Sequence, residues 1–272
     1  MSKKLAVIQF PGSNCEYETV YAANQFGFDA EIIPWNCSED LFMSFDVYIL
    51  PGGFSFQDRV RAGAVSAKLP VMSYLEKVCD EGRPILGICN GCQILSESGL
   101  VPDISDSHKI EIALAPNTKN NDSFGFMCEW VFVKVDNPGA NVFTRSFNSN
   151  DVIPIPINHG EGRFIFSSDI DPSTLPVTTL KYCNSKGEVI ESYPTNPNGT
   201  SYNIAAISNK KGNVLAIMPH PERASFLHQI PHSIDSEWSL KKQAKFKSGY
   251  TTTSGPWEKL FTSVKESLES CV

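Results

Sequence analysis

The fold of this 272-residue chain is decided by residues 84–93, which read Pro-Ile-Leu-Gly-Ile-Cys-Asn-Gly-Cys-Gln. A short apolar run over Ile85–Ile88 leads directly into Cys89, which stands between Gly87 and Gly91. A helix-compatible segment follows at once. This order predicts a buried strand, a tight turn and a helix, with the cysteine at the turn. It has the form of a nucleophile elbow in which a thiol replaces the serine hydroxyl.

The elbow gives Cys89 the surroundings that a nucleophile needs. Glycines on both sides permit a sharp turn and leave little side-chain bulk around the sulfur. The N-terminus of the following helix favours the thiolate over the thiol. The same pattern also occurs in a plain packing turn, so a catalytic interpretation needs a partner elsewhere in the chain.

A suitable partner stands at 218–223, which reads Met-Pro-His-Pro-Glu-Arg after a second apolar run over Val214–Met218. His220 could accept the proton of Cys89, and Glu222 could orient the imidazole from the same short loop. Each half is a weak signal alone. Together they are stronger, because each follows a predicted buried strand, where α/β folds place their chemistry.

The nearby Cys92 allows other interpretations of the same stretch. Residues 89–92 have the spacing of a redox dithiol, although a thioredoxin-like site would lie in a much smaller domain. Zinc is disfavoured because no second Cys-x-x-Cys and no His-x-x-x-His supplies the remaining ligands. We therefore expect no metal, and Cys92 as a small apolar residue on the buried face of the helix.

Composition limits the class of protein. The net charge of −7 and the pI near 5.3 argue against a general nucleic-acid binder. Hydrophobic content of 41% is typical of a globular protein with a sizeable core. No apolar run approaches the length of a membrane span, and no signal peptide opens the sequence. We therefore expect a cytoplasmic protein whose eight cysteines are reduced.

The first half of the chain alternates short apolar runs with helical patterns, which predicts a parallel, doubly wound sheet covered on both faces. The expected helices lie at 16–26 and, as a pair, between Val60 and Asp80. The expected strands are Leu5–Phe10, Ala30–Trp35, Asp46–Leu50 and Ile85–Ile88.

From about Trp130 the apolar runs are separated by turns without helical periodicity, which predicts a mixed or antiparallel extension of the same sheet. We expect one domain over 1–272 with its core at about 4–224, a polar insertion at 224–256 and an amphipathic helix at 257–270. The expected strands here are Trp130–Val135, Val152–Ile157, Thr178–Tyr182, Ile204–Ile207 and Val214–Met218.

Ligands of open α/β sheets bind beyond the carboxyl ends of the strands. The loops at Gly52-Gly53, Cys89, 158–160 and His220 all satisfy this, so they can meet in one cleft. The chemistry that such a cleft supports is acyl transfer: a thiolate attacks a carbonyl, and the resulting oxyanion needs hydrogen-bond donors.

Two backbone N–H groups are candidates for those donors, those of Gly53 and of Asn90, the residue after the nucleophile. A phosphate-binding loop at Gly52-Gly53 is disfavoured because no Gly-Lys-Ser/Thr follows. The glycine-rich loop around His159 could contact a ligand through its backbone, but a structural histidine explains it equally well.

These residues resemble those of a known protein family. Residues 87–93 together with His220-Pro221-Glu222 resemble the class I, triad-type glutamine amidotransferases, whose fold is flavodoxin-like. Within that family, the segments 7–16, 51–64 and 158–164 are similar to glutaminase subunits of an ATP-dependent synthase in purine synthesis.

The resemblance implies that the substrate is L-glutamine and that Cys89 forms a γ-glutamyl thioester. It implies His220 as general base and acid, Glu222 as the group that orients it, and Gly53 and Asn90 as the oxyanion hole. The residues implied to hold glutamine are Gln93, Asn158, His159 and Gly160.

The resemblance implies no cofactor in this chain. The ammonia would pass to a large synthase subunit that uses ATP and Mg²⁺, and a small third subunit would complete the complex. The sequence departs from the family pattern at Cys92, where a larger apolar residue is usual, and at Gln57 and Arg59, within a usual Gly-Asp-Tyr pattern. None of these departures removes a catalytic group.

Three alternatives stay open at the level of sequence. The chain could serve another synthase, such as one that makes pyridoxal phosphate or a pyrimidine nucleotide. It could be a redox sensor, chaperone or peptidase, since such proteins also carry an elbow cysteine on a flavodoxin-like sheet. It could also be an inactive scaffold, although every expected catalytic residue is present.

Overall fold

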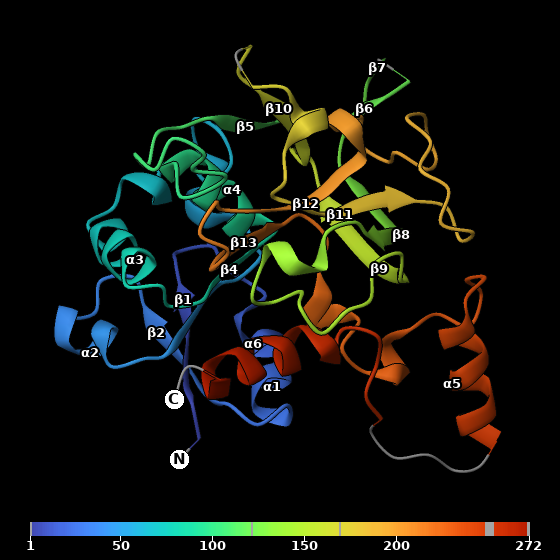
Figure 1. The fold of residues 1–272 in the computed structure, drawn as a ribbon, viewed down its shortest axis with the longest axis horizontal. Coiled ribbons are helices and arrows are strands. Elements are labelled where there is room, and N and C mark those ends of the chain that lie inside the picture. Colours follow the sequence, from blue (N-terminus) through green and yellow to red (C-terminus); the bar gives the residue numbers. More distant parts are fainter. Residues whose placement is uncertain (1, 121, 169, 248–252, 271–272) are drawn as a thin grey trace.

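The computed structural model describes residues 2–120, 122–168, 170–247 and 253–270. Its centre is a nine-stranded sheet in the order β2-β1-β3-β4-β13-β12-β11-β8-β9 (Figure 1). The strands of this sheet are β1 (Lys4–Gln9), β2 (Asp29–Pro34), β3 (Val47–Leu50), β4 (Ile85–Ile88), β8 (Met127–Val135), β9 (Val152–His159), β11 (Thr178–Cys183), β12 (Ile204–Ser208) and β13 (Val214–Ile217).

The first half of the sheet is parallel. Strands β2, β1, β3, β4 and β13 pair in parallel with their neighbours. Every residue of β3, β4 and β13 is buried, as is the stretch Leu5–Ile8 of β1. Continuous burial is expected for parallel strands, because helices cover both faces of such a sheet. The predicted α/β fold class is confirmed.

The second half of the sheet is antiparallel, as the sequence predicts. Strand β13 pairs antiparallel with β12, and the ladder continues through β11 and β8 to β9. Along the last part of β8, buried residues alternate with partly exposed ones, which is the pattern of a strand with one covered face. The short strands β5 (Ile112–Ala115), β6 (Thr118–Lys119), β7 (Asp122–Ser123) and β10 (Arg163–Phe166) form two further small sheets.

The helices are α1 (Glu16–Gln25), α2 (Glu39–Met43), α3 (Val71–Asp80), α4 (Asn90–Ser98), α5 (Glu237–Lys247) and α6 (Glu258–Ser270). Helices α1 and α6 lie side by side (Figure 1), and the ring of Phe26, just after α1, is 5.3 Å from that of Phe261 on α6. Helix α4 packs on β4 and β13, directly behind the elbow. No helix in the described ranges has the length and apolar character needed to cross a bilayer.

One helix prediction differs from the structure. Between Val60 and Asp80 there is one α-helix, α3, preceded by a 3-10 turn over Ser66–Lys68. The expected pair fails because Leu69 stands before Pro70 and takes the extended backbone that a following proline favours. In the stretch 224–256 the structure contains α5, which lies at the periphery of the molecule in Figure 1.

Candidate functional site

Cys89 occupies a strained backbone position at the end of β4 and the start of α4. Its dihedral angles are φ 50° and ψ −102°, a combination that L-residues rarely adopt. Strain of this kind persists only where the surrounding structure enforces it, and it is concentrated at functional sites. The side chain is 5% exposed, and its Sγ lies 3.6 Å from the carbonyl oxygen of Asn158.

The two glycines of the elbow are required by packing as well as by the turn. A Cβ on Gly91 would lie 2.0 Å from the backbone oxygen of Leu50, and a Cβ on Gly87 would lie 2.6 Å from the oxygen of Gly91. Helix α4 can therefore approach β3 and β4 closely only because both positions lack a side chain. This close approach places Cys89 at the N-terminus of α4.

His220 and Glu222 form a buried pair on the loop that follows β13. His220 Nδ1 lies 2.6 Å from Glu222 Oε1, and both side chains are at most 2% exposed. The backbone N–H of His220 donates to the carbonyl of Pro156 on β9, which fixes the loop against the sheet. Within the described residues His220 Nε2 has no hydrogen-bond partner, so the imidazole keeps one nitrogen for a reacting group.

The charge balance around His220 favours its protonated form. Burial alone lowers the pKa of this imidazole, but the Glu222 carboxylate and, less strongly, the thiols of Cys89 and Cys15 raise it well above its ordinary value. Cys89 acts on the imidazole chiefly through its charge. The Cys89 thiol therefore lies close enough to His220 to influence its charge.

A cavity of about 100 Å³ opens over Cys89. It brings together three of the four loops that the sequence predicts to meet, while His220 lies beside it, against Gly52. The residues that line the cavity are Gly53, Phe54, Asp58, Ala62, Cys89, Gln93, Phe126, Asn158, His159, Gly160 and Glu161.

Of the two expected oxyanion donors, Gly53 lines this cavity, whereas Asn90 follows Cys89 in the chain and is not among the lining residues. Gly53 has a φ of +148°, which side chains rarely tolerate. A Cβ on Gly53 would also lie only 2.7 Å from the Cα of Ser13, so the position has no room for a side chain. Asn90 is the first residue of α4, so its N–H has no acceptor within the helix. The Asn90 side chain is engaged by its neighbours, since its Oδ1 accepts from the N–H of Ser55.

Gln93 joins the elbow helix to the loop after β9. Its Nε2 donates to the carbonyl of Glu161 at 2.7 Å, and its Oε1 accepts from Asn90 Nδ2 at 2.9 Å. The amide is therefore already hydrogen-bonded at both ends. Gln93 lines the cavity, and it also fixes the 158–161 loop in place.

His159 is a fully buried imidazole that stays neutral. Burial and the neighbouring His220 lower its pKa to about 3. Its Nδ1 lies 3.1 Å from Asn117 Oδ1, an oxygen that also accepts from the N–H of Gly162. Asn117 Nδ2 donates to the carbonyl of His159. Asn117, which the sequence analysis did not identify, therefore organises this loop.

Two carboxylates that the sequence analysis also missed line the cavity, those of Asp58 and Glu161. Burial, with the charge of Glu161 as a second cause, raises the pKa of Asp58 to about 6. Asp58 lies in a segment whose residues Phe56, Gln57 and Val60 share its left-handed backbone. Nothing in the sequence marks this strain, because none of these residues is a glycine.

Cys15 is a further residue beside the pair. Arg223 Nη2 donates to its Sγ at 3.1 Å, and Arg223 also binds Glu18 on α1. Cys15, His220 and Glu222 bring possible metal-ligand atoms within 4.8 Å of one another. His220 Nδ1 and Glu222 Oε1 are already joined by a hydrogen bond, so we assign no metal to this group.

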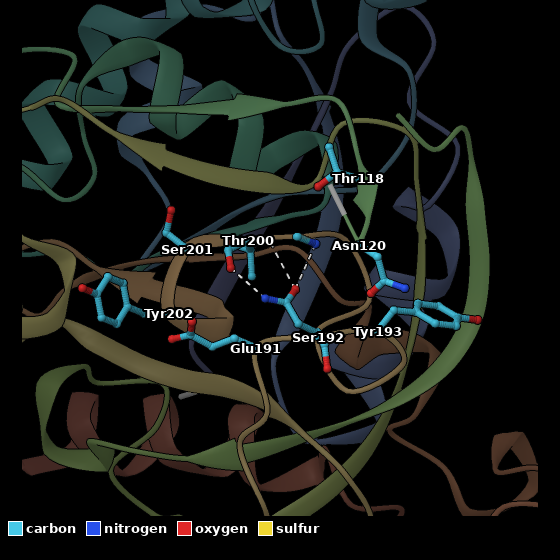
Figure 2. Close-up of a pocket in the computed structure, with 10 residues that line it drawn as sticks. Thr118, Asn120, Glu191, Ser192, Tyr193, Thr200, Ser201 and Tyr202 are labelled. Atoms are coloured by element: carbon cyan, nitrogen blue, oxygen red, sulfur yellow. Dashed lines mark hydrogen bonds between the residues drawn. The ribbon is translucent and has the colours of Figure 1, made fainter. Parts of the chain in front are cut away.

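Figure 2 shows a second, larger hollow of about 540 Å³, lined mostly by polar side chains. Thr118 and Asn120 lie on one side of it, and Tyr202 lies opposite Tyr193. Asn198, the neighbour of the lining residue Gly199, connects this region to the loop of the first cavity, since its Nδ2 donates to the carbonyl of Gly162. None of its lining residues belongs to the cavity over Cys89.

Comparisons with known proteins show the family. The CobB/CobQ-like glutamine amidotransferase domain matches residues 2–266. Phosphoribosylformylglycinamidine synthase subunit PurQ of Methanothrix thermoacetophila is 41% identical over 278 residues, covering 98% of each chain. The PurQ subunit of Pyrococcus horikoshii is 42% identical over 222 residues, covering 82% of this chain and 89% of the relative.

A solved structure, that of PurLQS from Thermotoga maritima, superposes with a TM-score of 0.71 at 30% identity, covering 98% of this chain and 100% of that one. These matches leave no support for a redox sensor, chaperone or peptidase. The chain therefore belongs to the CobB/CobQ-like glutamine amidotransferase family and, within it, to the PurQ subunits of phosphoribosylformylglycinamidine synthase.

Proposed function

We propose that this chain is the glutaminase subunit of phosphoribosylformylglycinamidine synthase and that it hydrolyses L-glutamine through a thioester on Cys89. One observation carries the proposal. A strained cysteine faces a small cavity, and a buried imidazole beside it is anchored to Glu222 at 2.6 Å with its other nitrogen unpartnered. This is the arrangement of a nucleophile, a base and the group that orients the base.

In the first half of the reaction, the Cys89 sulfur attacks the side-chain amide carbon of glutamine while His220 holds the proton of the thiol. The oxygen of the tetrahedral intermediate accepts hydrogen bonds from the N–H groups of Gly53 and Asn90. His220 then protonates the amide nitrogen, which leaves as ammonia. Glu222 keeps the imidazole oriented and stabilises its charged form.

In the second half, water attacks the γ-glutamyl thioester with His220 as base, which releases glutamate and restores the thiol. Gln93 and the loop of Asn158, His159 and Gly160 hold the glutamine. Gln93 acts partly through the loop, since its amide already binds the carbonyl of Glu161.

The ammonia passes to a large synthase subunit, which uses ATP and Mg²⁺ in the amidine-forming step of purine synthesis. The relatives named as synthase subunits and the PurLQS structure support this partner. A small third subunit completes the proposed complex. The cytoplasmic location and the single-domain organisation expected from the sequence stay predictions.

The test separates the two half-reactions in the assembled complex. Cys89→Ala removes the only group that we assign to open glutamine and leaves the synthase site untouched. We expect glutamine-dependent synthesis to be lost and synthesis from ammonium salts to be retained. Loss of both activities in a complex that still assembles would contradict the proposed division of labour.

A further inference from the structure

Arg223 follows Glu222 directly in the chain and contacts three groups. Its Nη2 donates to the Sγ of Cys15, the residue that precedes α1, at 3.1 Å. Its Nε and Nη2 both donate to Glu18 Oε1 on α1, at 3.2 and 3.0 Å. Its Nε also lies 3.8 Å from Glu222 Oε1, the atom that binds the imidazole of His220. The guanidinium therefore joins the start of α1 to the buried pair of His220 and Glu222.

Glu222 is a buried carboxylate that needs opposite charge nearby. Its side chain is 0% exposed, and its Oε2 has no hydrogen-bond partner among the described residues. In the part of the chain that the structure describes, only His220 and Arg223 form ion pairs with it. A buried carboxylate without opposite charge takes up a proton, and it then no longer stabilises a charged imidazole. Because His220 gains and loses its proton in the proposed reaction, Arg223 is the cation that stays.

Arg223 keeps its charge in this position. Burial lowers the pKa of the guanidinium, but Cys15, Glu222 and Glu18 raise it above its ordinary value. The Arg223 side chain is 34% exposed, so water reaches it but does not reach Glu222. The attraction between the guanidinium and this carboxylate is therefore screened less than it would be between two groups in water.

Cys15 connects Arg223 to the imidazole. Its Sγ lies within 4.8 Å of possible ligand atoms of His220 and Glu222. A Cβ on Gly52 would lie 2.7 Å from His220 Cε1 and 3.0 Å from Cys15 Sγ, so the ring and the sulfur face the same backbone. Cys15 is buried, and Arg223 binds its sulfur. The imidazole is thus bounded by Glu222, by the backbone of Gly52 and by a sulfur that Arg223 holds in place.

We infer that Arg223 is a positioning residue for glutamine hydrolysis: it keeps Glu222 charged and holds the imidazole of His220 in place. The inference rests on the proposed function, because the pair on which Arg223 acts belongs to that reaction. Arg223 is not among the residues that line the cavity over Cys89, so it acts through other residues and not on the substrate.

The charge of Arg223 has a definite effect on the pH dependence. A positive charge disfavours protonation of its neighbours, so without Arg223 the pair of His220 and Glu222 holds its proton more tightly. An imidazole that is already protonated accepts no proton from the thiol, so activity falls at low pH. Loss of Arg223 therefore moves this acidic limb to higher pH, and loss of the negative charge of Glu18 does not.

The other charges around the imidazole stay the same in this comparison. Glu16, the first residue of α1, binds Gln9 instead. The titratable and charged groups that surround the imidazole or bind its neighbours are Glu222, Arg223, Cys89, Cys15, Glu18 and His159.

The test measures glutaminase kinetics against pH in the assembled complex, for the wild type, Arg223→Gln, Arg223→Lys and Glu18→Gln. Arg223→Lys keeps the positive charge, and Glu18→Gln removes only the ion pair to α1. Arg145→Gln is the matched control, because it removes an exposed arginine from the segment between β8 and β9. Synthesis from ammonium salts shows that each complex is folded and assembled.

For Arg223→Gln we expect kcat to fall roughly 10- to 100-fold, the loss that one charge-assisted contact produces, and the acidic limb to move up by about 0.5 to 1 pH unit. The KM for glutamine should change by less than about threefold, because Arg223 does not touch the substrate. Arg223→Lys should recover most of kcat and the wild-type limb. Glu18→Gln should stay within about threefold of the wild-type kcat, without a raised limb. The control should change neither quantity.

The inference is overturned if Arg223→Gln and Glu18→Gln lose the same factor, since Arg223 would then only tether α1 to the loop. It is equally overturned if Arg223→Gln keeps the wild-type kcat, or loses kcat without any shift of the acidic limb.

Should Arg223→Gln fail to assemble, the other two variants decide. A raised limb in Arg223→Lys, or a loss of more than about tenfold in Glu18→Gln, overturns the inference, and wild-type pH profiles in both support it. A wild-type complex that makes product from ammonium salts but does not hydrolyse glutamine would instead refute the proposed function, and the inference with it.

Discussion

At the scale of single residues, the site assigns different tasks to two neighbours on one loop. His220 presents the unpartnered Nε2, while Glu222 contacts only the far side of the imidazole. In the proposed mechanism the first residue moves a proton, and the second sets which nitrogen carries it. The two should therefore differ in how much activity depends on them.

We predict that His220→Ala lowers glutaminase turnover roughly 10²- to 10⁴-fold, the range for removing a general base. Glu222→Gln should cost less, because an amide oxygen can still accept from Nδ1–H. Turnover is measured in the assembled complex, with circular dichroism as the check on folding. Equal losses, or a larger loss in Glu222→Gln, would contradict the separate roles.

The raised pKa of Asp58 makes the stability of the folded protein depend on pH. Its pKa is raised to about 6, so the folded protein retains this proton to a higher pH than the unfolded chain, whose ordinary value is 3.8. Between these values the folded state binds more protons than the unfolded state, and the stability that Asp58 contributes falls as pH rises. Above pH 6 the folded protein holds an unfavourable charge.

We therefore predict that Asp58→Asn is more stable than the wild type at pH 7.5, by on the order of 1 kcal/mol once solvent screening of this half-exposed group is allowed for. The gain should largely vanish at pH 4. Urea unfolding at both pH values measures it, with Glu191→Gln as control, because it removes a carboxylate from the other hollow. A variant less stable than the wild type at pH 7.5 would show that burial does not strain this carboxylate.

At the scale of secondary-structure elements, the contact between α4 and β3 controls the elbow. The contact is possible only because Gly91 has no side chain, since the atom opposite is the backbone oxygen of Leu50. A backbone oxygen cannot rotate out of the way as a side chain can. A methyl group here must push the helix, and Cys89 with it, away from the sheet.

We predict that Gly91→Ala destabilises the fold by about 1–3 kcal/mol, the usual cost of overpacking, and abolishes most glutaminase activity. Gly125→Ala is the matched control, because a Cβ at Gly125 meets nothing within 4 Å. The control should change stability by less than about 0.5 kcal/mol. Unfolding free energies from urea titrations compare the two, and equal effects would rule out the packing explanation.

The elements also show what sequence patterns can predict. Strands β1, β3, β4 and β13 are continuous apolar runs, and their buried positions follow from that pattern alone. Strands β5 and β10 were missed because they pair only with each other, over four residues, and leave little periodicity to detect. Helix α5 was missed because its polar and apolar residues are not segregated on opposite faces.

The same limit applies to the site. Cys89, His220 and Glu222 carry distinctive residue types at the ends of recognisable strands, so the sequence could identify them. Asp58 and Glu161 could not be identified, because an acidic residue in a loop is ordinarily solvated. Their place in the cavity wall depends on backbone conformation, which residue spacing does not encode.

At the scale of the whole molecule, one sheet combines two kinds of pairing for one purpose. The parallel half supplies the elbow and the loop of His220, and antiparallel β9 supplies the loop over the cavity. The two halves meet where β13 pairs with β4 on one side and β12 on the other. The central claim is that this junction turns one cysteine among eight into a nucleophile for glutamine.

That claim is tested most directly by treating the assembled complex with a glutamine analogue that carries an electrophile, and then mapping the modified cysteine by mass spectrometry. We predict that the label is found on Cys89, because burial raises the pKa of the Cys92 and Cys15 thiols and keeps them protonated. A label on Cys92 or Cys15, with Cys89 unmodified, would contradict the account.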